Sequence, residues 1–288
     1  MRGVFCYTKP MSEGIPLSPK TPSSLERRES SSVAAFQLLG NREEQQDAFA
    51  FQSLKERCHD TWRFIVADGH GPDGGTIARD VVDAMNHALS VLGHDVTTED
   101  IRELFADAHA HIIEKKWDGG TTVTLTLLRE GRLTTAWVGN SQARLARRDG
   151  GLETLAIPHE YLAHPAERVR LDHGGATVAP QGHPATRGHL LIGQQSFECT
   201  RSLGDTDLRS SFILHEPEIR QATLRDDHAF LLIGSDGFWE KLKRRRHIIE
   251  HTLGQAKNAA EANRQIKTLI SNWKLDDNTT LLIVDVQK

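Results

Sequence analysis

Residues 121–150 read TTVTLTLLREGRLTTAWVGNSQARLARRDG, and their pattern sets the expected fold class. Short runs of apolar and β-branched residues predict strands at Thr121–Leu128, Leu133–Val138 and Ala143–Arg147. The turn-forming pair Glu130-Gly131 separates the first two runs, and Asp149-Gly150 follows the third. Connections this short join antiparallel neighbours, because a parallel crossover needs about a dozen residues or more. We therefore expect mainly antiparallel sheets.

The same texture continues on both sides of this stretch. Further strands are predicted at Val33–Leu39, Ala48–Phe51, Trp62–Ala67, Ala229–Ile233 and Thr280–Val286. Two long helices are expected between the early strands, one from Gly75 to about Leu92 and one with Thr97 or Thr98 as its N-cap. A short helix is predicted at Ala166–Asp172, and one or two more between His247 and Ser271. Helices mixed with antiparallel strands indicate the α+β class.

The composition excludes several functional classes. The chain has 288 residues, 26% of them charged, and a net charge of −4, so no basic excess attracts it to nucleic acid. No apolar run approaches the roughly 18 residues that a membrane helix needs, and no apolar stretch of signal-peptide type opens the chain. The cysteines Cys6, Cys58 and Cys199 are far apart and indicate neither a disulfide framework nor a cysteine zinc site. We expect a cytoplasmic or nuclear protein with no nucleic-acid or membrane partner.

The first 32 residues differ from the rest of the chain. They contain Pro10, Pro16, Pro19 and Pro22 together with seven serines and few large apolar groups. Such a composition cannot bury enough apolar surface to offset the entropy of ordering. The sequence therefore predicts a disordered Ser/Pro-rich tail over residues 1–32 and one folded domain over residues 33–288.

Four aspartates lie directly beside predicted strands. Asp47 precedes one run, Asp68 and Asp236 each follow one, and Asp277 stands shortly before the last. If these strand ends meet at one sheet edge, the carboxylates repel one another unless cations neutralise them. Oxygen ligands without cysteine favour hard ions, magnesium or manganese, over zinc. The sequence therefore predicts a carboxylate metal site.

Seven segments, in order, resemble the motifs of the metal-dependent protein phosphatase family, the type 2C serine/threonine phosphatases. They are Asn41–Asp47, Val66–Gly71, Gly120–Thr122, Trp137–Ala143, Thr200–Asp205, Ser235–Trp239 and Asp277–Thr280. The resemblance covers about residues 33 to 287. It implies a four-layer α-β-β-α sandwich, in which two mainly antiparallel sheets face each other and helices cover the outside. It also implies hydrolysis of phosphoserine and phosphothreonine monoesters in phosphorylated protein substrates by a water that two metal ions activate.

The resemblance implies a role for individual residues. Asp47, Asp68, Asp236 and Asp277, with the carbonyl of Gly69, match the positions that hold two Mg²⁺ or Mn²⁺ ions. Arg42 matches the guanidinium that grips phosphate, and its planar fork suits two phosphate oxygens. His70 matches the proposed general acid that protonates the leaving alkoxide. The Thr200–Asp205 motif is interpreted as architectural.

Two departures from the family pattern concern the metal site. Asn140 stands where the family commonly has aspartate, which argues against a third ion, although Glu240 stands at the other position of that site. Gln46 replaces a glutamate of several relatives. These changes keep open a pseudophosphatase, a phosphopeptide-binding or scaffolding module without turnover. A different binuclear metallohydrolase, such as a phosphodiesterase, is a second alternative, but the four aspartates favour the phosphatase.

No catalytic or metal-binding role is assigned to two other clusters of residues. The basic residues Lys241, Lys243, Arg244, Arg245 and Arg246 are expected to form a solvated helix start. The histidines at 159, 164, 173, 183 and 189 fall in a Gly/Pro-rich region that resembles the family's variable flap, and their irregular spacing disfavours a second metal site. A monomer is expected.

Overall fold

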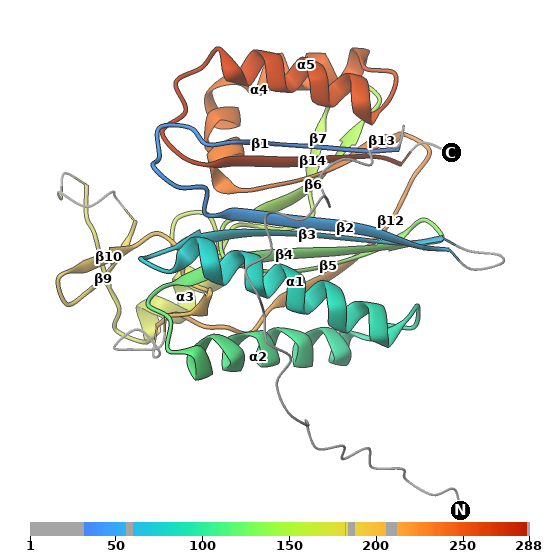
Figure 1. Cartoon of the computed structure of the whole chain (residues 1–288). Coiled ribbons are helices and arrows are strands. Elements are labelled where there is room, and N and C mark those ends of the chain that lie inside the picture. Colours follow the sequence, from blue (N-terminus) through green and yellow to red (C-terminus); the bar gives the residue numbers. More distant parts are fainter. Residues whose placement is uncertain (1–31, 56–59, 182, 184–187, 206–211, 287–288) are drawn as a thin grey trace, which may run out of the picture.

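The computed structural model describes residues 32–55, 60–181, 183, 188–205 and 212–286. Two β-sheets lie face to face, with helices on both outer faces (Figure 1). The strands within each sheet pair antiparallel. The predicted α+β sandwich is confirmed. The predicted tail and the residues Cys6 and Cys58 lie outside the described part of the chain, apart from Ser32.

The first sheet has five strands in the order β1-β14-β13-β6-β7. Their bounds are Val33–Leu38 (β1), Thr279–Asp285 (β14), His228–Gly234 (β13), Gln142–Arg147 (β6) and Leu152–Thr154 (β7). Helices α4 (Asp236–Gln255) and α5 (Ala259–Ser271) cover its outer face (Figure 1). The Asp149-Gly150 turn joins β6 to β7, as its position predicted.

The second sheet follows the order β12-β5-β4-β3-β2, and β11 adds to β4. Its strands are Glu218–Thr223 (β12), Arg132–Val138 (β5), Gly120–Arg129 (β4), Asp60–His70 (β3), Asp47–Lys55 (β2) and Leu203–Gly204 (β11). Helices α1 (Gly74–Leu92) and α2 (Thr98–Lys115) cover the outer face of this sheet. Thr97 is the N-cap of α2, where its hydroxyl accepts a hydrogen bond from the Asp100 backbone N–H.

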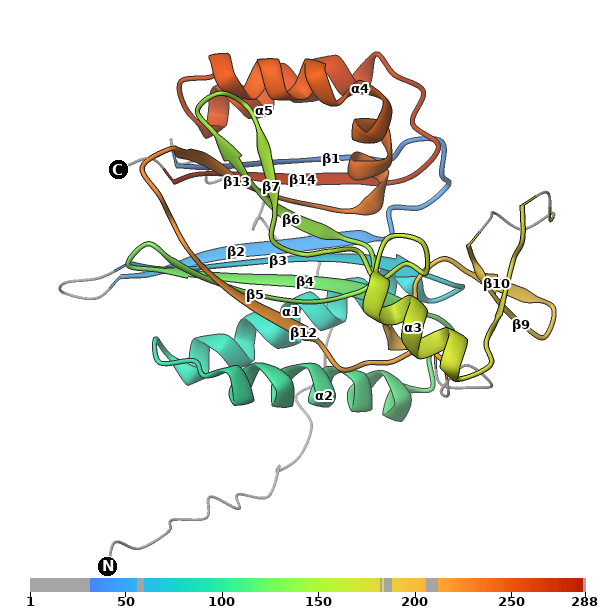
Figure 2. The ribbon, with the colours of Figure 1, turned by 180° about the vertical axis from the view of Figure 1, so that it is seen from behind.

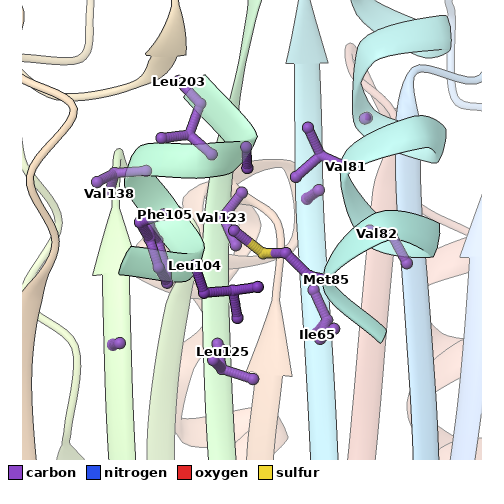
Figure 3. Close-up of a cluster of buried hydrophobic side chains, with 14 of the residues drawn as sticks. Ile65, Val81, Val82, Met85, Leu104, Phe105, Val123, Leu125, Val138 and Leu203 are labelled. Carbon is purple, nitrogen blue, oxygen red and sulfur yellow. The ribbon is translucent and has the colours of Figure 1, made fainter. Parts of the chain in front are cut away.

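Three apolar layers hold the sandwich together. Side chains of α1 and α2, such as Met85 and Phe105, pack on Ile65 and Val123 of the second sheet (Figure 3). A second layer fills the space between the two sheets, and a third lies between the first sheet and helices α4 and α5. Alternate residues of β3 therefore face opposite layers, which fixes the register of the strand that carries Asp68.

A smaller flap stands at one end of the sandwich. It contains α3 (Pro165–His173) and the strands β8 (Thr177–Val178), β9 (Leu190–Ile192) and β10 (Gln195–Phe197) (Figure 2). Its own small core includes Leu171, Leu190 and Ile213. No helix in the described part of the chain is long and apolar enough to cross a membrane.

Helix α4 begins earlier than the sequence predicted. It starts at Asp236, not near His247, so the basic cluster lies inside the helix, next to a break in helical geometry at Arg245. Asp236-Gly237 has the composition of a turn, and Gly237 is a poor helix former. Burial of Phe238, Trp239 and Leu242 outweighs that local preference. The sequence therefore missed the helical segment before the break, whereas the segment after Arg245 corresponds to the helix predicted from His247.

Candidate active site

Asp47 and Asp68 face each other across two neighbouring strands. Asp47 is the first residue of β2, and it pairs in register with Asp68 near the end of β3. Asp68 therefore lies within the strand and not after it, as the shorter predicted strand implied. This pairing follows from the hairpin register, which places the two carboxylates at the same end of the second sheet.

The first sheet contributes the contacts that hold Asp47. The hydroxyls of Ser235 and Thr280 donate to Asp47 Oδ2 at 2.8 and 2.7 Å. Ser235 precedes α4 but makes no side-chain cap, because its hydroxyl is directed at Asp47 instead. Asp47 Oδ1 is buried and has no hydrogen-bond partner among the described residues. A buried carboxylate oxygen without a donor is the arrangement that a cation would complete.

Asp236 and Asp277 bring further negative charge from the first sheet. Asp236 is the first residue of α4, and Asp277 lies two residues before β14. The carboxyl groups of Asp68 and Asp236 lie close enough to shift each other's pKa. Asn140 follows β5, and its amide donates to Asp236 Oδ2 at 2.9 Å. The four predicted metal ligands therefore come together from both sheets at one end of the sandwich.

Burial and mutual repulsion disfavour ionisation of Asp47, Asp68 and Asp236. Burial, and then the repulsion of Asp236 and Asp277, raises the pKa of Asp47 to about 7, despite the opposing Thr280 and Ser235 hydrogen bonds. Burial raises the pKa of Asp68 well above its usual value, and Asp47, Asp236 and Asp277 add to this. Burial followed by Asp277 also raises the pKa of Asp236. Divalent cations remove this conflict, so the residues present fit a hard metal site.

Gly69 lies where the backbone is too crowded for a side chain. A Cβ at this position would lie 2.1 Å from the Gly74 carbonyl oxygen. The Gly69 N–H donates to the Gln46 carbonyl at 3.1 Å, and the Gln46 amide donates to the Gly71 carbonyl at the same distance. Gln46 therefore stabilises the turn that follows β3 at His70.

Arg42 lies at the same end of the sandwich, in the connection from β1 to β2. Its Nη2 donates to Asp277 Oδ2 at 2.6 Å, and its Nε donates to the Asp276 carbonyl at 3.3 Å. The Arg42 side chain is 52% exposed, so it can also contact a ligand from solvent. The structure thus places the predicted phosphate-binding arginine against a predicted metal ligand.

His70 has a partner that the sequence analysis did not assign. Its Nε2 lies 2.7 Å from Asp205 Oδ2, and the Asp205 side chain is only 1% exposed. The hydroxyl of Ser202 donates to the same oxygen at 2.5 Å. A Cβ at Gly120 would lie 2.6 Å from Asp205 Oδ2 and 2.9 Å from His70 Nε2, so only glycine permits the contact. The architectural interpretation of the Thr200–Asp205 motif was therefore incomplete.

A cavity of about 620 Å³ opens onto these residues. Six of the seven predicted site residues line it, all except Asp47, and the flap supplies one wall. The lining includes Arg42, Asp68, Gly69, His70, Asn140, Gln195, Phe197, Glu198, Cys199, Asp205, Asp236 and Asp277. Cys199 is a free thiol whose pKa burial raises well above its usual value, so it is not a nucleophile at neutral pH. The cavity is therefore a carboxylate-rich cleft with one arginine and one histidine.

A second acidic group adjoins Asp236. Carboxylate oxygens of Glu160, Glu198 and Glu240 all lie within 4.8 Å of one another. Burial, and then the charges of Asp236 and the other two glutamates, raises the pKa of Glu198 to about 8. Sequence reasoning identified only Glu240, because the three residues are far apart in the chain. These oxygens could hold a cation beside the four aspartates.

The flap histidines His159 and His164 also converge on a carboxylate, that of Glu218. Their Nε2 atoms lie 3.4 and 2.8 Å from Glu218 Oε2. His159 Nδ1 accepts from the Gly139 N–H, and His164 Nδ1 accepts from the Glu167 N–H. A neutral ring whose Nδ1 accepts must carry its proton on Nε2, so both histidines donate to Glu218. Their hydrogen bonds close the flap onto the second sheet and leave no nitrogen lone pair for a metal.

This buried histidine pair predicts acid sensitivity. Burial is the main cause that lowers the pKa of His159 to about 4, against about 6.5 in an unfolded chain. The unfolded state therefore binds an additional proton below about pH 6.5, and this group should remove roughly 3 kcal/mol of stability as the pH falls to 4. Between pH 7 and pH 4.5, the free energy of unfolding measured in urea should fall less for His159→Leu than for the parent. The exposed His173→Leu variant should match the parent, and equal losses in all three proteins would contradict the prediction.

Comparisons with known proteins agree with this architecture. The family model described as Protein phosphatase 2C matches residues 33–279. Protein phosphatase 1K, mitochondrial, of Xenopus laevis is 31% identical, with 88% of this chain and 68% of the relative covered. Probable protein phosphatase 2C 2 of Arabidopsis thaliana is 26% identical over 92% of this chain and 70% of its own length. A solved serine-threonine phosphatase 2C from Toxoplasma gondii shares the fold, with a TM-score of 0.67 and 18% identity over 88% of this chain and 94% of its own.

Proposed function

The chain belongs to the protein phosphatase 2C family, and we propose that it hydrolyses phosphoserine and phosphothreonine monoesters in proteins with the help of two divalent cations. The observation that supports this most strongly is the convergence of Asp47, Asp68, Asp236 and Asp277 from both sheets, where burial and mutual repulsion raise the pKa of the first three. Burying carboxylates that repel one another destabilises the fold, and a module that only binds phosphopeptides would not require them. The pseudophosphatase alternative is therefore the weaker candidate.

The four aspartates and the Gly69 carbonyl are the groups that would hold Mg²⁺ or Mn²⁺. When bound, such ions lower the pKa of water to near neutrality and offset charge on phosphoryl oxygens. The orphaned Asp47 Oδ1 and the exposed Asp277 carboxylate supply the oxygen ligands that hard cations prefer.

Arg42 and His70 act on the substrate itself in this proposal. The Arg42 guanidinium has donors beyond those used on Asp276 and Asp277, and these would bind the phosphate oxygens. Asp205 occupies His70 Nε2, so a proton for the leaving serine or threonine oxygen would come from Nδ1. Arg42 thus orients the phosphate, and His70 assists departure of the alcohol.

The direct test is phosphate release from a phosphopeptide panel in Mg²⁺, Mn²⁺ or chelator. Metal-dependent release that is lost in Asp68→Ala and Asp236→Ala supports the proposal. Activity on bis-p-nitrophenyl phosphate without activity on phosphopeptides would instead indicate a phosphodiesterase. Phosphopeptide binding without any metal-dependent turnover would indicate the pseudophosphatase.

Asn140 provides a test of metal number. Its amide donates to Asp236 Oδ2 and so neutralises part of the charge that an additional cation would need. Asn140→Asp should therefore create a further weak metal site and change the dependence of turnover on metal concentration. Calorimetric Mn²⁺ titration alongside rate measurements checks this, with Asn140→Ala as the control that removes the amide without adding charge. Titrations and rates that match the parent would disprove it.

Phosphorylated proteins are the substrate class that the family implies. A cytoplasmic or nuclear location and a monomeric state remain predictions from the sequence. One relative carries the word mitochondrial in its name, so fractionation of expressing cells should include that compartment.

A further inference from the structure

A second cavity, of about 680 Å³, lies at the other end of β3 from Asp68. Residues 94–97, in the connection from α1 to α2, form part of its lining. Its polar lining combines the basic residues Arg63, His94, Arg129 and Arg132 and several threonines with two acidic residues, Asp95 and Glu130. At about 3.3 Å per residue, Arg63 is roughly 17 Å along the strand from Asp68. The cavity is therefore separate from the candidate active site.

Arg63 is the unusual residue of this cavity. It lies on the helix-facing side of β3, two residues before Ile65, which belongs to the apolar core in Figure 3. The Arg63 residue is only 1% exposed. Its Nη2 donates to the Gly93 carbonyl at the C-terminal end of α1, but Nε and Nη1 have no hydrogen-bond partner within the described ranges. A fully buried guanidinium thus has two of its three nitrogens unsatisfied.

Such a group is unfavourable unless something completes its contacts. Burying unpaired N–H donors costs free energy, and the cost is larger for a charged group. The negative end of the α1 dipole offsets part of this cost, yet burial still lowers the pKa of Arg63. Within the described ranges no carboxylate pairs with Arg63, and Asp95, which also lines the cavity, pairs instead with Arg129 at 2.5 Å. The missing partner is therefore negative or strongly hydrogen-bond accepting.

We propose that this cavity binds a small oxyanion, a molecule bearing a phosphate or carboxylate group, with Arg63 as the buried anchor. The exposed side chain of Arg132 adds positive charge at the rim, and the Thr61 and Thr134 hydroxyls add donors. Both free nitrogens of Arg63 are covered, so the anion would reach them when the long arginine side chain rotates toward the cavity. The volume falls within the range of small-molecule sites. This proposal does not depend on the catalytic activity.

Binding at this cavity is distinguished from binding at Arg42 by the Arg63 signal and by the variants of the cavity. The full chain in EDTA, without divalent metal, would be titrated with inorganic phosphate and with malonate at constant ionic strength set by chloride. We expect a saturable rise in Tm together with a shift of the Arg63 Nε–Hε NMR signal. Arg63→Met should weaken the apparent affinity by about tenfold or more, as expected for loss of a charged hydrogen bond. The exposed helix residue Arg264 provides the control, and Arg264→Met should bind like the parent.

Arg132→Met, at the exposed rim, provides a second variant in case Arg63→Met does not fold; it should weaken binding several-fold. Tighter binding of phosphate than of malonate would indicate a ligand with a phosphoryl group. Tighter binding of malonate would indicate a ligand with a carboxylate. The proposal is overturned if neither anion gives a saturable effect, or if the parent, Arg132→Met and Arg264→Met respond alike. It is likewise overturned if the Arg63 Nε–Hε signal does not move at saturation, which would indicate a structural arginine that only caps α1.

Discussion

Asp47→Asn should reduce phosphatase activity by more than about 10²-fold and, at the same time, stabilise the metal-free protein at pH 8. The activity loss follows from removal of an anionic ligand, since loss of even an outer partner of a metal ligand costs about 10- to 100-fold. The stability gain follows from the buried position of Asp47, whose pKa is raised from 3.8 to about 7. These opposite signs distinguish a metal ligand from a residue that merely supports the fold.

The sign of the stability change can be worked out from linkage. A carboxyl group with a raised folded-state pKa contributes stability below about pH 4 and loses it as the pH rises through 7. At pH 8 without metal, the ionised Asp47 carboxylate should cost up to about 4 kcal/mol, which asparagine removes while keeping an acceptor for Ser235 and Thr280. Saturating Mg²⁺ or Mn²⁺ should stabilise the parent more than the variant.

Urea unfolding at pH 5 and pH 8, in EDTA or in Mn²⁺, measures the pH dependence of stability and the stabilisation by metal. Asp107→Asn, on the exposed face of α2, is a matched control that should alter neither activity nor stability. A variant that is destabilised at pH 8 in EDTA would show that Asp47 is structural. The same result would remove the main support for the metal site.

Asp205→Asn should slow the enzyme in a manner that depends on the leaving group. Asp205 accepts from His70 Nε2, so it fixes the orientation of the ring and leaves Nδ1 available for the leaving group. Loss of general acid assistance typically costs about 10²- to 10⁴-fold when the leaving group is a poor one. We therefore expect about a 10²-fold lower kcat for phosphoserine peptide or phenyl phosphate, but only a few-fold change for p-nitrophenyl phosphate, whose phenolate leaves without a proton.

Several variants check this interpretation. His70→Gln should show the same dependence on the leaving group, and the double variant should lose little more than either single one, because the two residues act as a unit. Thr200→Val belongs to the same sequence motif, but its hydroxyl contacts Glu167 instead of His70. It should therefore affect all substrates equally. A uniform loss in Asp205→Asn would assign Asp205 to structure alone.

The sequence predicted the main fold because its local signals agree with the tertiary structure. Apolar alternation and the Glu130-Gly131 turn indicated antiparallel strands, and the strand-end aspartates indicated a shared edge. Asp47 and Asp68 pair in register because both flank one hairpin, so a local rule suffices to place them together. The predicted boundaries were less accurate. β2 and β3 extend beyond their apolar runs, because the residues at their ends are held in the strand by pairing with the neighbouring strand and not by burial.

The contacts that sequence reasoning missed are those between distant residues. Asp205 meets His70 across 135 positions, and this depends on the close approach that Gly120 allows. Glu160 and Glu198 reach Glu240 only because the flap folds over the end of the sandwich. Arg63 looked like an ordinary polar residue in an alternating strand, and only the packing of α1 and α2 shows that it is buried. None of these has a local signature, because each results from packing between elements.

The position of β14 has a consequence for synthesis on the ribosome. β1 pairs only with β14 among the described strands, and β14 lies between β1 and β13. β1 must therefore wait for β14, which leaves Val33 and Phe36 uncovered until β14 has been synthesised. A nascent chain stopped before residue 277 would lack both this central strand and Asp277, so premature termination should yield an aggregation-prone product without partial activity.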